Sequence, residues 1–203
     1  MDMQITATAI ERASKRIAQT MIEHSAEFNR LDAIGGDGDM GTSLAAIGRT
    51  ILADSAPFPQ DIGACFSRLA SSIAKTSGSS LSAVLMTGLM AAAKQTKGQP
   101  DLPLHTIPDL IESALLVMQA RSKASLGDKT ILDGLAAIAL ATRIPTAETA
   151  FSEVALCAAS DALEEFRDRP VTIGRMRLAK DGGAGHDDPG LVALKLAIES
   201  MAQ

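Results

Sequence analysis

Glycine and proline interrupt this sequence at short intervals and leave about eight stretches of helical length between them. The first stretch carries one apolar stripe with the spacing of an α-helix, formed by Ala9, Ile10, Ala13, Ile17 and Met21. Aromatic residues make up 2% of the chain, so residues that favour strands are scarce. The expected helices cover approximately residues 6–28, 41–54, 61–75, 80–97, 106–123, 130–142, 145–168 and 189–201. Because the connections are short, we expect antiparallel neighbours in one all-α domain, residues 1–203.

The polar and glycine-rich connections fall at every other junction between the expected helices. They lie at residues 32–39, 76–79, 125–129 and 171–188, and they are rich in Asp, Gly and Ser. In an up-and-down bundle, alternate connections lie at the same end. The sequence therefore predicts that these four loops meet and form a site at one end of the bundle.

Three carboxylates stand within eight residues in the first of these loops, at Asp32, Asp37 and Asp39. Asp37 and Asp39 are two apart, so in an extended loop their side chains point the same way. Such carboxylates repel one another unless a cation lies between them, and Mg²⁺ prefers a few carboxylates together with phosphate oxygens. The loop contains several glycines and precedes a helix whose N-terminus could face an anion. These features favour a metal–phosphate site.

An acidic turn whose aspartates cap a helix accounts for the Asp-Gly-Asp spacing equally well. A calcium site of the EF-hand type is disfavoured, because no Glu completes a twelve-residue loop.

Composition limits the other classes of function. The net charge of −5 and the absence of basic runs argue against nucleic-acid binding. The N-terminus does not resemble a signal peptide, and the longest apolar stretch, 81–93, is too short for a membrane span. We therefore expect a cytoplasmic protein without a membrane association. Cys65 and Cys157 are expected to be buried reduced thiols. The Met and Leu stripes of the helices at 80–97 and 106–123 are expected to face the core.

Four stretches, in order, are similar to the signatures of a single family. They are Leu31-Asp32 with Gly36-Asp37-Gly38-Asp39 and Gly41-Thr42, then Thr76-Ser77-Gly78, then Gly127-Asp128-Lys129-Thr130, then Gly185-His186-Asp187-Asp188-Pro189-Gly190 preceded by Gly174-Arg175. Together they resemble the nucleotide-binding L subunit of dihydroxyacetone kinases. Met40 departs from the pattern, because the family commonly has His at that position.

The resemblance implies a barrel of eight antiparallel helices with ADP or ATP bound across one end. Asp32, Asp37 and Asp39 would ligate two Mg²⁺ ions, and Asp37 and Asp39 would be the catalytic carboxylates. The other nucleotide contacts carry over to Met40, Gly41, Thr42, Ser43, Thr76, Ser77, Ser122, Ile131, Arg175, Asp188, Pro189 and Gly190.

The activity implied by the resemblance is phosphoryl transfer to a hydroxyl of dihydroxyacetone or a related short ketose, held on a separate K subunit. The phosphoryl donor would be exchanging ATP or a phosphotransferase-system protein that recharges bound ADP, and a homodimer is also left open. Two alternatives stay open. One is a nucleotide-binding regulatory subunit without turnover. The other is a fatty-acid-kinase-like domain, which the Gly-His-x-Asp-Pro-Gly turn and the lack of a C-terminal lipid-binding domain disfavour.

Overall fold

The computed structural model describes residues 3–76, 79–144 and 148–202. Within these ranges the chain is almost entirely helical, as predicted. The α-helices are α1 (Ala7–Glu23), α2 (Ser25–Asp32), α3 (Met40–Ala53), α4 (Ile62–Thr76), α5 (Ser80–Gln95), α6 (Ile107–Ser122), α7 (Ile131–Ala141), α8 (Glu148–Arg167) and α9 (Pro189–Ala202).

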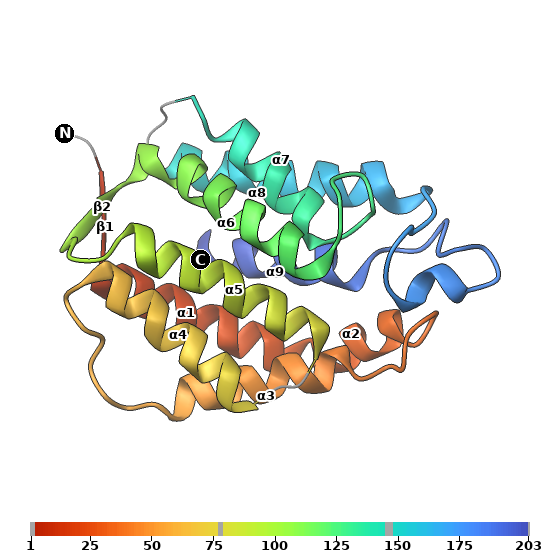
Figure 1. Cartoon of the computed structure of the whole chain (residues 1–203), viewed down its shortest axis with the longest axis horizontal. Coiled ribbons are helices and arrows are strands. Elements are labelled where there is room, and N and C mark those ends of the chain that lie inside the picture. Colours follow the sequence, from red (N-terminus) through yellow and green to blue (C-terminus); the bar gives the residue numbers. More distant parts are fainter. Residues whose placement is uncertain (1–2, 77–78, 145–147, 203) are drawn as a thin grey trace.

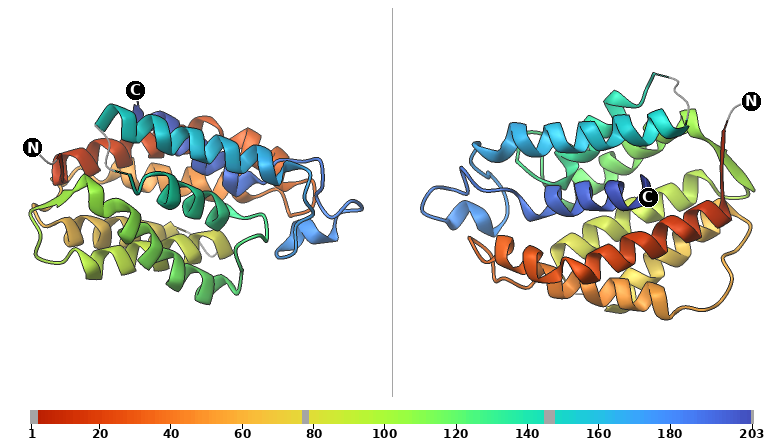
Figure 2. Two further views of the ribbon diagram at one scale, coloured as in Figure 1. Left: turned by 90° about the horizontal axis from the view of Figure 1, so that it is seen from above. Right: turned by 180° about the vertical axis from the view of Figure 1, so that it is seen from behind.

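Eight of these helices form a closed ring (Figure 1). α1 packs on α3, and the contacts continue through α4, α5, α6, α7 and α8 to α9, which packs back on α1. Figure 2 shows from two further sides that neighbouring helices lie side by side along their length. The main core cluster joins α1, α2, α3, α8 and α9 through residues that include Phe28, Leu44, Phe166 and Leu191. The barrel of antiparallel helices implied by the family resemblance is therefore confirmed.

The predicted helix at 6–28 is wrong in one respect, because two helices replace it. Thr6 caps α1, accepting a hydrogen bond from the Ala9 N–H, and α1 ends at a break at His24. The short helix α2 then turns to lie along the start of α3. Gly41 allows this approach, since a Cβ there would stand 1.9 Å from the Ser25 carbonyl oxygen. The break thereby brings Asp32, the last residue of α2, to the N-terminus of α3.

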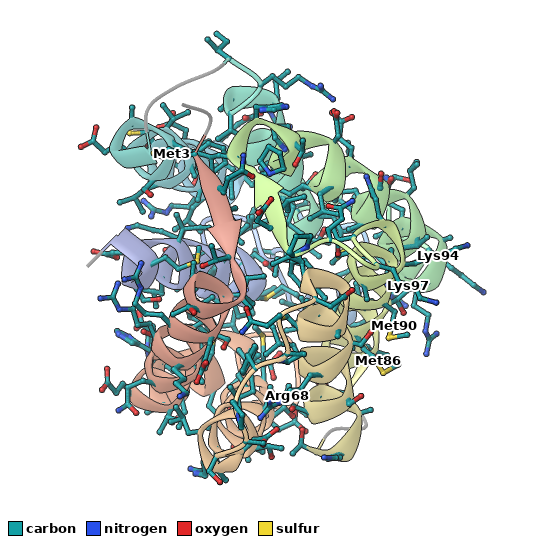
Figure 3. The ribbon with its side chains drawn as sticks, turned by 90° about the vertical axis from the view of Figure 1, so that its left-hand side faces the viewer. Met3, Arg68, Met86, Met90, Lys94 and Lys97 are labelled. Atoms are coloured by element: carbon teal, nitrogen blue, oxygen red, sulfur yellow. The ribbon has the colours of Figure 1, made fainter. Side chains whose placement is uncertain are left out.

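A small antiparallel sheet that the sequence analysis missed lies at one end of the barrel. Strand β1 (Gln4–Thr6) pairs with β2 (Asp101–Pro103), and the 3-10 helix η1 (Leu104–Thr106) follows. Figure 3 looks at this end, with both strands in front and the helices behind them. Asp61 caps α4 there and accepts hydrogen bonds from the N–H groups of Ala64 and Gly98.

The expected burial of several side chains is only partly right. Cys65 is buried, whereas Cys157 is exposed, because α8 turns its Ala155, Ala158 and Ala159 face inward. Met90 of α5 is 51% exposed and Leu116 of α6 is 70% exposed. Figure 3 shows Met86 and Met90 on the outer side of α5. In a ring of single helices, each helix keeps one stripe facing solvent, so not every apolar stripe is in the core.

No helix in the described part of the chain is both long enough and apolar enough to cross a membrane.

Candidate functional site

A cavity of about 800 Å³ opens at the end of the barrel opposite the β1–β2 sheet. All four of the loops expected to converge contribute to its lining. The lining residues fall in the ranges 32–43, 79–84, 121–132, 171–176 and 188–190, and the last two ranges both belong to the fourth loop and the helix start that follows it. The volume lies within the range of small-molecule and cofactor sites. In Figure 1 this is the right-hand end, where the loop after α2 faces the loops around η2 (Arg175–Leu178).

Three carboxylates meet at the rim of the cavity. Asp32, Asp37 and Asp39 each offer an oxygen, and these oxygens lie within 4.8 Å of one another. Asp37 and Asp39 are exposed and Asp32 is half-buried. Within the described ranges, this is the group of side chains with the spacing of a metal site. Carboxylate oxygens at this separation are the donors that Mg²⁺ prefers.

Asp32 organises the start of α3 from across the loop. Its Oδ2 accepts hydrogen bonds from the backbone N–H of Asp39 at 3.0 Å and of Met40 at 3.4 Å. Asp39 occupies the N-cap position of α3, but its own side chain makes no capping bond. The cap is therefore supplied by Asp32, and the Asp39 carboxylate can be directed at the cavity rim instead.

The residues after Met40 divide into cavity-lining and structural ones. Met40 and Ser43 line the cavity, whereas Gly41 and Thr42 do not. Thr42 exchanges two hydrogen bonds of 3.0 Å with the side chain of Asn29 on α2, one through its N–H and one through its hydroxyl. Asn29 was not anticipated from the sequence, and it fixes α2 on α3 beside the carboxylates.

The opposite wall of the cavity is apolar. It is formed mainly by aliphatic side chains from α5, α7 and the loops before α7 and α9, among them Leu81, Val84, Ala124, Ile131, Leu132 and Ile173. Ser122 also lies on this wall, where its hydroxyl donates to the Met118 carbonyl and accepts from the Ala124 N–H. Arg121 supplies a cation beside it. The acidic rim and the apolar wall together suit a ligand that has a polyanionic part and a flat apolar part.

The start of α9 completes the lining with Asp188, Pro189 and Gly190. Asp188 Oδ1 accepts the Leu191 N–H at 2.9 Å and so caps the helix. Withdrawal from water raises the pKa of Asp188 to about 6, against the opposing effect of its backbone N–H donors and of Lys129.

The remaining predicted residues fall outside the described cavity lining. Thr76 ends α4, and its hydroxyl donates to carbonyls of its own helix. Ser77 lies outside the described residues, and so does the side chain of Arg175. The backbone neighbours of Arg175, Gly174 and Met176, do line the cavity. They belong to the cavity loop, the name used here for residues 169–183.

The Gly127-Asp128-Lys129-Thr130 stretch is more structural than its place in a nucleotide signature suggested. Asp133 completes a capping box with Thr130 at the start of α7. Asp128 accepts hydrogen bonds from Ser125 N–H and from the hydroxyl of Thr172 in the cavity loop. Lys129 lines the cavity yet is only 1% exposed, and burial lowers its pKa. Its backbone has a positive φ of 62°, which the sequence could not show.

A family model described as the DAK2 domain matches residues 34–203. The chain belongs to the DAK2 domain family. Its match begins two residues after Asp32, so the first carboxylate lies just outside the matched region.

Two relatives place the chain within this family. It is 30% identical to Triokinase/FMN cyclase of Rattus norvegicus over 194 residues, which are 93% of this chain and 33% of that protein. It is 23% identical to the ADP-binding subunit DhaL of the PEP-dependent dihydroxyacetone kinase of Escherichia coli, covering 98% of both chains. The chain thus spans about one third of the triokinase relatives and nearly all of the bacterial subunit.

Solved structures show the same fold. The native dihydroxyacetone kinase of C. freundii superposes with a TM-score of 0.78 at 20% identity, over 96% of this chain and 34% of that one. The complex of that enzyme with AMP-PNP and Mg²⁺ superposes with a TM-score of 0.72 at 19% identity, over 100% of this chain and 35% of the other. The chain is a divergent member of the DhaL-like domains.

Proposed function

We propose that this DAK2 domain binds a Mg²⁺-nucleotide in the cavity and donates its phosphoryl group to a short ketose held on a separate K-type subunit. The observation that carries the proposal is the meeting of Asp32, Asp37 and Asp39 at the rim of a cavity whose far wall is aliphatic. The acidic rim suits the metal and the phosphates, and the aliphatic wall suits the base.

The residues that line the cavity fit Mg²⁺ and a nucleotide. Bound Mg²⁺ would neutralise phosphate charge and polarise the phosphoryl group, the main contributions of metal ions to such transfers. Asp37 and Asp39 would supply metal-binding oxygens as the catalytic carboxylates. Asp32 would supply one oxygen to the metal while its other oxygen holds the start of α3. We propose two Mg²⁺ ions at this site, with either ADP or ATP as the nucleotide.

Hydrogen bonds within the site determine which groups of α3 can contact a phosphate. The N–H groups of Met40 and Thr42 already donate to Asp32 and Asn29, so they are not available in this arrangement. The Ser43 side chain lies at the cavity and is the polar group of α3 best placed there. Ile131, Leu81 and Val84 offer the base an apolar surface.

The relatives support this reading through what their names state. The E. coli relative is an ADP-binding subunit of a dihydroxyacetone kinase, and other relatives are named L-erythrulose kinase and D-erythrulose kinase. We therefore propose dihydroxyacetone or erythrulose as the acceptor class. The donor would be exchanging ATP or a phosphotransferase-system protein.

A docking surface for the K-type subunit would surround the mouth of the cavity. Two large apolar side chains are exposed on segments that also contribute lining residues, Leu126 at 53% and Leu178 at 75%. Exposed apolar residues beside a cavity favour a partner that covers them.

The test is a reconstituted transfer assay. The purified chain is mixed with a K-type subunit, Mg²⁺-ATP and each ketose, and phosphorylated sugar is measured. The proposal predicts product only when both subunits are present, with loss of product for the double variant Leu126→Ser, Leu178→Ser. Nucleotide binding without product from any ketose or donor would contradict the proposed transfer.

One observation favours a second candidate, a nucleotide-binding regulatory subunit. Met40 lines the cavity where the family commonly has His, and a thioether cannot donate or relay a proton. If Met40→His raises turnover from an undetectable level, the regulatory role is favoured for the natural chain. If the natural chain already turns over, the transfer role stands.

A further inference from the structure

The cavity loop leaves and rejoins the barrel through a narrow neck. It follows α8, contributes Val171, Ile173, Gly174 and Met176 to the cavity lining, and returns before α9. At the neck, the Val171 N–H donates to the Gly182 carbonyl at 2.7 Å, and the Gly185 N–H donates to the Arg167 carbonyl at 2.9 Å. The two stems of the loop are therefore held together at its base.

Lys129 occupies this neck from the opposite side, on the loop before α7. Its Nζ donates to the carbonyl oxygens of Arg167 at 2.8 Å, Arg169 at 3.0 Å and Gly183 at 2.7 Å. The first two acceptors belong to the outgoing stem and the third to the returning stem. One ammonium group thus bridges both stems and joins them to the start of α7.

The donor count of Lys129 decides between two roles. A lysine ammonium has three N–H donors, and all three are used by these carbonyls. A lysine that lines a nucleotide cavity would ordinarily be assigned to a phosphate. Here a phosphate contact would require the loss of a bond to the neck.

The charge of Lys129 suits its acceptors. Arg167 is the last residue of α8, so its carbonyl carries the partial negative charge of a helix C-terminus. Arg169, two residues beyond, and Gly183 leave carbonyls at the same point. The nearby carboxylates of Asp188, Asp187, Asp168 and Asp181 add attraction for the ammonium. An apolar side chain would remove all three donors from these carbonyls, a recognised cost.

We infer that Lys129 is a positioning residue whose ammonium holds both stems of the cavity loop against the barrel and thereby sets how long a nucleotide stays bound. The role is indirect, through Val171, Ile173 and Met176, which form part of the cavity wall. The inference about dwell time rests on the proposed function, whereas the inference about the loop does not.

Two substitutions test the role. Lys129→Gln keeps two N–H donors for the three carbonyls, and Lys129→Met removes all of them. Asp61→Ala serves as the control, because it removes two backbone contacts at the other end of the barrel. All three variants are compared with the natural chain by thermal melting, so that the loss of stability in each variant is known.

Amide hydrogen exchange without ligand tests the loop directly. In Lys129→Gln we expect exchange about ten-fold faster at the amides of Val171, Gly182 and Gly185, the change expected for loss of one charge-assisted bond. Amides of α1, α3 and α4 should keep their natural rates. Unchanged exchange in the cavity loop would overturn the inference. So would faster exchange through the whole barrel, or failure of both Lys129 variants to fold, since either result makes Lys129 a global stabiliser.

Release of a fluorescent ADP analogue in the presence of Mg²⁺ tests the dwell time. The release rate should rise about ten-fold in Lys129→Gln and more in Lys129→Met, while Asp61→Ala should leave it within about two-fold. Equal release from the Lys129 variants and the natural chain would overturn the inference. If the natural chain binds no nucleotide, the proposed function fails, and the exchange experiment still decides the role of Lys129.

Discussion

The two ends of the barrel use acidic residues in opposite ways. At the sheet end, both carboxylate oxygens of Asp61 accept hydrogen bonds from backbone N–H groups. Asp61 thereby joins the start of α4 to the turn after α5. At the cavity end, Asp32, Asp37 and Asp39 gather with their oxygens within 4.8 Å of one another. Carboxylates so close together repel one another, so this arrangement lowers stability unless a cation is bound.

The sheet end of the fold is built for stability, and the cavity end is built for binding. The sheet end is held together by the pairing of β1 with β2 and by the capped start of α4. The cavity end holds its loops with bonds that run around the cavity, such as those of Asn29 and Lys129, and leaves carboxylates at the rim. Functional residues are expected where such unfavourable groupings are tolerated.

The largest expected effect concerns Asp37. Asp37→Asn removes one of three carboxylates from the rim, and we expect Mg²⁺-ADP to bind about 100-fold more weakly, equivalent to about 2.7 kcal/mol. Titration calorimetry measures the change. Glu164→Gln is the matched control, since it removes an equal charge near the C-terminal end of α8 from a residue outside the cavity lining. Equal affinities for the two variants would contradict the metal assignment.

A pair of glycine substitutions compares the two ends. A Cβ at Gly41 would stand 1.9 Å from the Ser25 carbonyl oxygen, and a Cβ at Gly63 would stand 2.5 Å from the Ala93 carbonyl oxygen. We expect Gly41→Ala and Gly63→Ala each to lower the free energy of unfolding by about 2–3 kcal/mol, through overpacking against backbone. Urea denaturation measures this loss.

Only the first of the pair should affect the nucleotide. Gly41→Ala separates α2 from α3 and so displaces Asp32 from the start of α3, whereas Gly63 lies at the sheet end. Nucleotide affinity is therefore measured on both folded variants, and only Gly41→Ala should bind more weakly than the natural chain. A weaker affinity in Gly63→Ala as well would show that the ends are coupled.

Asp188 should make the cavity end sensitive to pH. Its pKa in the fold is raised to about 6, so the folded chain keeps a proton that the unfolded chain releases near pH 4. This contribution to stability is therefore present below about pH 4 and is lost as the pH rises through 6. The shift corresponds to at most about 3 kcal/mol, and partial exposure reduces our expectation to about 2 kcal/mol.

The measurement is the free energy of unfolding of the natural chain relative to Asp188→Asn, at pH 4 to 7. Asn caps helices well, so the variant keeps the start of α9. The natural chain should lose its advantage over the variant between pH 4 and 6. A difference that is constant over this range would show that the carboxylate titrates normally.

The smallest expected effect is at the sheet end. Asp61→Ala removes the cap of α4 and should lower the free energy of unfolding by about 1 kcal/mol, without changing nucleotide affinity. Thermal melting and calorimetry on the same sample provide both values. A change in affinity would break the separation between the two ends.

The sequence predicted those features that local chemistry determines. Glycine and proline punctuation predicted about eight helices, and the family resemblance implied the barrel. Alternate loops rich in Asp, Gly and Ser predicted the cavity end. The caps Asp61 and Asp133 are of the same local kind, because each accepts from a backbone N–H only a few positions away.

Features that depend on distant partners could not be predicted. Asp32 caps α3 through a break at His24 that periodicity does not signal. β1 and β2 are nearly a hundred residues apart and too short for a recognisable pattern. Asn29 and Lys129 act on backbone groups whose positions only the closed ring defines. Cys157 and Met90 were misplaced because periodicity does not tell which helix stripe faces outward.

If Asp32, Asp37 and Asp39 hold the metal, nucleotide binding must depend on Mg²⁺. Calorimetric titration of the natural chain with ADP, in excess Mg²⁺ and again in excess chelator, measures this dependence. We expect saturable one-to-one binding with Mg²⁺ and a loss of affinity of about 100-fold or more in chelator. Absence of binding in excess Mg²⁺, or equal affinity in the two conditions, would contradict it.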